Sequence, residues 1–164
     1  MPFNRLSLDA INSVSPCKVD TRNGYEFVFH THTNVVYLIS FKEDMRIANE
    51  QSYQLIIERV TDKVAYDTDV KDTIICIINE FFTKNDKILL YICDTADGRE
   101  SVRNRLFLRW FEESDVNHLY DIKTANATVE GEGMYFAIIL KKSNPHYIEI
   151  IQEFDTVATE LTNK

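Results

Sequence analysis

The fold class is decided by one stretch of the chain, Ile88-Leu-Leu-Tyr-Ile-Cys-Asp94-Thr-Ala-Asp97-Gly-Arg99-Glu-Ser-Val-Arg103-Asn-Arg105-Leu-Phe-Leu-Arg109-Trp110. Residues 87–93 have strand length and, after Lys87, form an uninterrupted apolar run, which is typical of an interior strand covered on both faces. Asp97 and Glu100 then resemble a capping box, with Asp in place of Ser or Thr, and predict a helix that ends near Glu113. The stretch therefore predicts an interior strand followed by a helix.

One stripe of this predicted helix carries arginines where apolar side chains are expected. At about 100° per residue, the stripe contains Arg99, Arg103, Leu106 and Trp110. A buried arginine needs a carboxylate, a carbonyl or an anionic ligand, because an unpaired buried charge is very costly. The stripe therefore predicts either internal ion pairs or a bound anion.

The junction between strand and helix is the candidate ligand site. It comprises Asp94, Asp97, Gly98, Arg99 and Arg103. Crevices at strand ends and helix N-termini are where α/β proteins commonly bind anions and nucleotides. Two interpretations stay open: the aspartates pair with the arginines internally, which we favour, or the arginines hold a small anionic ligand. A catalytic role is the least favoured.

Hydrophobic periodicity predicts the remaining elements. In chain order they are an N-terminal arm over residues 1–23 with a short strand at 18–21, strands at 25–30 and 35–41, a polar link over 43–52, a strand at 53–59, a helix from 67 to 84, the strand and helix described above, strands at 118–129 and 134–142, and a helix that starts at Asn144-Pro145. A helix over 53–59 is the weaker alternative. The order βββαβαββα predicts a single α+β domain over residues 1–164, with helices packed on one mostly antiparallel sheet.

Composition and charge exclude several classes of protein. The formal net charge of −8 repels nucleic acid, so DNA or RNA binding through Arg105 and Arg109 ranks last. No apolar run is long enough to span a bilayer, and we expect a cytoplasmic protein without a membrane partner. The three cysteines, Cys17, Cys76 and Cys93, form no close pair and are interpreted as free thiols.

Signals of catalysis and of metal binding are weak. His30 and His32 lie on one face of a strand at a spacing that chelates zinc, but no further ligand follows nearby. The chain has no glycine-rich phosphate loop and no nucleophile elbow. We therefore expect no catalytic residues, no metal site and no cofactor.

Acidic and aromatic residues are the candidates for a docking surface. The acidic region after the arginine-bearing helix contains Glu112, Glu113, Asp115, Asp121, Glu130 and Glu132. Such a region is usually solvated surface, and its functional alternative is a docking surface for a basic partner. Eight tyrosines and ten phenylalanines exceed what the predicted core requires, and aromatic residues are enriched at protein interfaces.

Three short motifs resemble a known family: Ile92-Cys-Asp94 with Asp97-Gly-Arg99, then Arg103-Asn-Arg-Leu-Phe107, then Arg109-Trp-Phe111. Together they are similar to a segment in an uncharacterised family of short Bacteroidetes proteins, known only as a domain of unknown function. The resemblance implies that the Asp-Gly-Arg and Arg-Asn-Arg positions belong to the hallmark segment of that family. It also implies a cytoplasmic bacterial setting, and it carries no activity.

The sequence as a whole favours a non-enzymatic protein-interaction or regulatory module, an accessory protein of a bacterium or of its mobile elements. We expect it to bind another protein or a second copy of itself through its aromatic and acidic surface. The alternative is a small anionic-ligand binder, or an enzyme, that uses residues 94–103.

Overall fold

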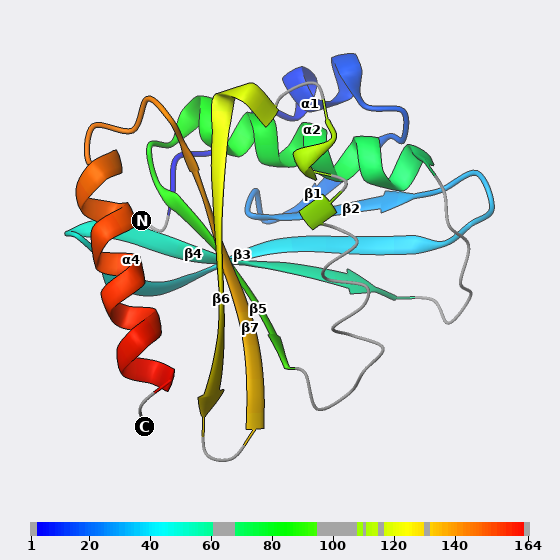
Figure 1. Ribbon diagram of the computed structural model, residues 1–164. Coiled ribbons are helices and arrows are strands. Elements are labelled where there is room, and N and C mark those ends of the chain that lie inside the picture. The colour runs from blue at the N-terminus through cyan, green and yellow to red at the C-terminus, as the bar shows by residue number, and fades with distance from the viewer. Residues whose placement is uncertain are drawn as a thin grey trace. The chain divides into compact units, whose positions relative to one another are not determined.

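The computed structural model describes residues 3–60, 68–94, 108–109, 111–114, 117–129 and 132–162. The elements are α1 (Leu8–Val14), β1 (Val19–Arg22), β2 (Glu26–His30), β3 (Val36–Ile47), β4 (Glu50–Arg59), α2 (Thr68–Lys84), β5 (Ile88–Asp94), the 3₁₀ turn η1 (Asn117–Leu119), β6 (Tyr120–Val129), β7 (Glu132–Lys141) and α4 (Tyr147–Thr162) (Figure 1). The order agrees roughly with the predicted one: α1 and η1 are additional, β1 takes the place of the short strand at 18–21, and the helix predicted after β5 lies mostly outside the described residues.

The strands form one seven-stranded sheet in the order β1-β2-β3-β4-β5-β7-β6. β4 and β5 pair parallel, and α2 forms the crossover between them. The other pairings of β1 with β2, β2 with β3, β5 with β7 and β6 with β7 are antiparallel. The mostly antiparallel sheet with its helices confirms the predicted α+β class.

Contacts group the chain into two compact units. Residues 1–42 and 55–85 form the first unit, and residues 43–54 and 86–164 form the second. Strands β3 and β4 each contain residues of both units. The single domain over residues 1–164 stays a prediction.

The core of the first unit is a cluster of aromatic rings. Phe81 of α2 is fully buried, with its ring stacked on Phe41 at 4.7 Å between centroids and 17° between planes. Phe3 adds edge-to-face contacts with Tyr25 at 5.2 Å and Phe41 at 5.4 Å. Edge-to-face and offset rings at such distances stabilise a core beyond their buried area.

Hydrogen bonds hold the beginning of the chain against the end of α2. Asn4 donates its backbone N–H to Asn85 Oδ1 at 2.7 Å, and Asn85 donates its side-chain amide to the Asn4 carbonyl at 3.2 Å. Ser7 donates its backbone N–H to the buried Glu80 carboxylate at 2.5 Å, and its hydroxyl caps α1 through the Ala10 N–H. Helix α1 thus lies in the segment that was predicted to be an N-terminal arm. It was not predicted because its seven residues include one buried side chain, which is too few to produce a helical period.

The predicted polar link over residues 43–52 is wrong, because strands β3 and β4 continue through it. Only Ala48 and Asn49 separate the two strands, and both have positive φ, at 52° and 64°. Two consecutive positive φ values are typical of a type I′ hairpin turn. The link was missed because Ala-Asn is not a usual turn pair and because Lys42, Glu43 and Met45 are exposed, so no apolar alternation marks the strand.

In the second unit, helix α4 packs on strands β5 and β7. The cluster of buried residues on this face comprises Ile47, Ile88, Leu90, Phe136, Ile138, Leu140, Ile150 and Phe154. Leu89 and Tyr91, which alternate with Ile88 and Leu90 along β5, are also buried. The burial of successive residues confirms that β5 is an interior strand covered on both faces.

Helix α4 begins two residues after its predicted first position. His146 donates its N–H to Asn144 Oδ1 at 2.8 Å, and the first helical bond runs from the Ile150 N–H to the His146 carbonyl at 2.9 Å. Asn144 therefore forms an Asx turn with Pro145 inside it, and the helix starts at Tyr147. The prediction made Asn144 the N-cap residue of the helix, because asparagine favours an N-cap and an Asx turn alike.

Candidate interaction surface

The residues of the predicted ligand site lie mostly outside the described part of the chain. Asp94 is the last residue of β5. Asp97, Gly98, Arg99 and Arg103 lie outside the described residues. The ligand interpretation of this junction therefore stays a prediction.

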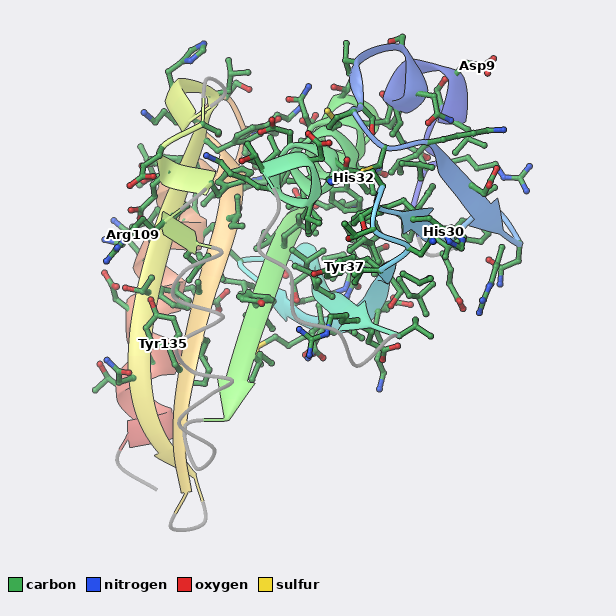
Figure 2. All side chains as sticks on the ribbon, turned by 90° about the vertical axis from the view of Figure 1, so that its right-hand side faces the viewer. Asp9, His30, His32, Tyr37, Arg109 and Tyr135 are labelled. Atoms are coloured by element: carbon green, nitrogen blue, oxygen red, sulfur yellow. The ribbon has the colours of Figure 1, made fainter. Side chains whose placement is uncertain are left out.

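At the described end of the predicted arginine-bearing helix, the buried residues lie outside the predicted stripe. Leu108 and Phe111 are buried, whereas Arg109 is exposed and lies on the outside of the molecule (Figure 2). The Glu113 N–H donates to the Arg109 carbonyl at 3.0 Å, which fits the predicted helix end. Leu106 and Trp110, which belong to the predicted stripe, lie outside the described residues.

A pocket of about 170 Å³ lies where this helix end meets the start of β6. Its lining residues are Phe111, Glu112, Tyr120, Asp121 and Ile122. The rings of Phe111 and Tyr120 are in contact, with 5.5 Å between their centroids. Phe111 and Tyr120 are themselves buried, and the two carboxylate residues of the lining, Glu112 and Asp121, are the groups that suit a cation.

Asp121 is held in place at the mouth of this pocket. Its Oδ1 accepts the N–H of Ile122 at 3.0 Å, and its Oδ2 accepts the hydroxyl of Tyr147 from α4. The hydrogen bond to the carboxylate retains the phenolic proton and raises the pKa of Tyr147, with smaller contributions from burial and from the negative charge of Asp121. Asp121, one of the residues that line the pocket, is therefore an oriented carboxylate.

Burial raises the pKa of the Tyr120 phenol from 10.0 to about 12. Between these pH values the folded chain retains a proton that the unfolded chain loses, so stability present below pH 10 is lost as the pH rises. We expect the free energy of unfolding to fall by up to about 1.4 kcal/mol per pH unit from this group. Urea unfolding from pH 9 to 12 should show a shallower fall for Tyr120→Phe, and equal slopes would contradict the assignment.

Exposed apolar and acidic side chains occur next in sequence to the residues of this site. Leu119 is 46% exposed directly before β6, and Ile148 is 66% exposed in the first turn of α4. Glu112 and Glu113 are exposed at the helix end. Of the other residues in the predicted acidic region, Asp115 and Glu130 lie outside the described residues, and Glu132 is the first residue of β7.

The histidine pair lies far along the chain from this surface, at the end of β2. His30 and His32 are both exposed (Figure 2). Across the described ranges, no three His, Cys, Asp or Glu side chains are grouped so that they could hold a metal ion. The same residues contain no helix that is both long and apolar enough to cross a membrane.

The sequence alone identified the carboxylates of this surface, but not its aromatic and apolar residues. Glu112, Glu113 and Asp121 belong to the predicted acidic region. Tyr120 and Tyr147 carried no signal of their own, because the contacts that give them a role join segments distant in the sequence. The exposure of Leu119 and Ile148 also depends on tertiary packing, which the hydrophobic periodicity of the sequence does not predict.

Comparison with protein families gives a match. A protein-family model described as "Family of unknown function (DUF6169)" matches residues 66–156, more than half of the chain. The matched range contains the strand-to-helix junction as well as the pocket residues. The search of curated proteins and the search of solved structures each found no match.

Proposed function

The chain belongs to the DUF6169 family of unknown function, and we propose that it is a non-enzymatic protein-interaction or regulatory module. We propose further that it binds a basic surface of another protein. The docking surface comprises Glu112, Glu113 and Asp121 around the pocket, with Leu119 and Ile148 as apolar contacts.

The pocket carries this proposal. A lysine or arginine side chain of a partner would gain the carboxylates of Glu112 and Asp121. Asp121 already has a fixed orientation, so little side-chain freedom is lost on binding. The net charge of −8 adds long-range attraction for a basic partner.

The resemblance of residues 92–111 supports two further parts of the proposal. We assign the Asp-Gly-Arg and Arg-Asn-Arg positions to the hallmark segment of the family. We also place the protein in the cytoplasm of a bacterium of the Bacteroidetes, as an accessory protein of the cell or of its mobile elements.

Charge reversal of the exposed glutamates tests the docking surface. The double variant Glu112→Lys/Glu113→Lys should bind the partner about tenfold or more weakly, since close charge pairs at interfaces are worth more than 1.4 kcal/mol. The measurement is affinity capture from a lysate of the host at low salt, with carbodiimide crosslinking to identify which carboxylates join partner lysines.

The matched control is Asp20→Lys/Asp155→Lys, which changes the net charge equally at exposed positions outside the surface. The proposal predicts that the control retains the same protein in the same amount, with crosslinks from Glu112 or Glu113. Equal capture by both double variants, or crosslinks only from other carboxylates, would contradict it.

A further inference from the structure

Three asparagines lie in tight turns where the backbone is left-handed. Their φ values are 53° at Asn23, 62° at Asn34 and 64° at Asn49, and all three residues are exposed. Asparagine tolerates this conformation better than most residues do, so the turns themselves explain why it occurs there. The three positions share one region of backbone conformation, and the residue that follows distinguishes them.

Glycine follows the first of these asparagines, whereas larger residues follow the other two. Val35 follows the second one, is buried, and donates its N–H to Thr31 Oγ1 at 3.1 Å. Glu50 follows the third one and is also buried. Gly24 carries no side chain beside its nitrogen. That nitrogen is therefore the least obstructed of the three for a reaction with the preceding side chain.

We propose that Asn23 is a site of spontaneous covalent modification, in which its side chain reacts with the backbone nitrogen of Gly24. The Gly24 N–H gives up its proton, and the nitrogen forms a bond to Asn23 Cγ. The bond from Cγ to Nδ2 breaks, and the Nδ2 group takes up a proton and leaves as ammonia. Water then opens the resulting succinimide ring at either carbonyl, which leaves aspartate or isoaspartate at position 23.

The turn must open before this ring can close. Tyr25 donates its N–H to Asn23 Oδ1 at 3.1 Å and to the Arg22 carbonyl at 3.3 Å. Both bonds lie at the end of β1, which has four residues and is the edge strand of the sheet. Short segments at an exposed edge open locally at a fraction of the free energy of global unfolding. The reaction can therefore proceed in the folded chain.

Arg5 places a positive charge over the reacting peptide. A Cβ at Gly24 would lie 2.5 Å from both Nε and Nη2 of Arg5, so the guanidinium covers this residue. The deprotonated nitrogen and the tetrahedral intermediate that follows it are both negatively charged. A nearby cation stabilises such charge, so we expect Arg5 to promote the reaction.

Isoaspartate changes the main chain of the turn, because its backbone runs through Cβ and Cγ and gains a carbon atom. The turn from Arg22 to Tyr25 depends on the regular spacing of a β-turn, which the longer main chain disrupts. Strand β1 in turn holds α1, since the Asn12 side chain bonds the Val19 N–H at 2.8 Å and the Val19 carbonyl at 2.9 Å. The modification would therefore loosen β1 and its contact with α1.

Peptide mapping by mass spectrometry, after prolonged incubation of the full chain at mildly alkaline pH, measures the reaction. Asn23 should be converted at least about tenfold faster than Asn34 and Asn49, because a Cβ obstructs the nitrogen that follows each of these. Isoaspartate should accompany aspartate, since the ring opens at either carbonyl. Equal rates at the three positions, or aspartate as the sole product, would overturn the proposal.

A pair of charge variants tests the contribution of Arg5. Arg5→Gln should slow the conversion about threefold, the order of effect expected when a nearby charge is lost in a solvated site. The matched control is Lys18→Gln, which removes an exposed positive charge at the other end of β1 and should react like the wild type. A rate for Arg5→Gln equal to or above that of the wild type would contradict the role of Arg5.

Hydrogen exchange of the modified chain, separated from the wild type by ion exchange, tests the consequence for the fold. The amides of β1 should exchange faster than in the unmodified chain, while those of α4 stay unchanged. Unchanged exchange in β1 would contradict the loosening. The inference is independent of the proposed basic partner, because Asn23 belongs to the first unit and takes no part in the docking surface.

Discussion

Replacing Phe81 by alanine is expected to lower the free energy of unfolding by about 3–5 kcal/mol. Phe81 has no exposed surface, and its ring contacts Phe3 at 5.5 Å and Phe82 at 5.4 Å in addition to Phe41. The substitution leaves a cavity in a cluster whose rings belong to the N-terminal segment, β3 and α2. These elements have little freedom to collapse into it, because Asn4 and Ser7 hold the N-terminal segment to α2.

Urea unfolding followed by circular dichroism measures this loss. The matched control is Val14→Ala at the end of α1, where the side chain is 71% exposed and a change within about 0.5 kcal/mol is expected. A loss below about 1 kcal/mol for Phe81→Ala would contradict the central place of Phe81 in this core.

Phe154→Ala should produce a loss of similar size, about 3–5 kcal/mol, in the second unit. Phe154 is buried in the apolar cluster that joins α4 to β5 and β7. Because α4 also packs against β6 and holds Asp121 through Tyr147, loosening this helix would disturb the proposed docking surface. Asp155→Ala, at the exposed neighbouring position, is the control and should change stability within about 0.5 kcal/mol.

The same two variants test the predicted single domain. Strands β3 and β4 each contain residues of both units, so separate unfolding would require each strand to break within its length. We expect one cooperative transition in the wild type, lowered by Phe81→Ala and by Phe154→Ala alike. Two transitions, each moved by one variant only, would show that the units unfold as separate domains.

The sequence predicted the fold where burial imposes a period. The run over residues 87–93 became β5, and the apolar spacing after Asp67-Thr-Asp69 became α2, because both elements bury most of their side chains. Where an element is mainly exposed, this signal disappears. The exposed end of β3 was therefore predicted as a link, together with the start of β4, where the buried side chains of Glu50, Gln51 and Ser52 are polar. The short helix α1 was missed because it too is mainly exposed.

The surface around β6 was predicted in part for a related reason. Local composition identified the carboxylates, since an acidic region is visible in the sequence alone. The position of β6 at the sheet edge, the bond from Tyr147 to Asp121 and the contact between Phe111 and Tyr120 depend on pairing between distant segments. No periodicity within a single element reports such contacts.

The salt dependence of partner capture tests the central claim most directly. The account predicts that capture by the wild type falls as the salt concentration rises, because exposed charges are screened, and that Glu112→Lys/Glu113→Lys captures little partner even at low salt. Capture that does not change with salt, or that is equal for this variant and for Asp20→Lys/Asp155→Lys, would contradict the claim.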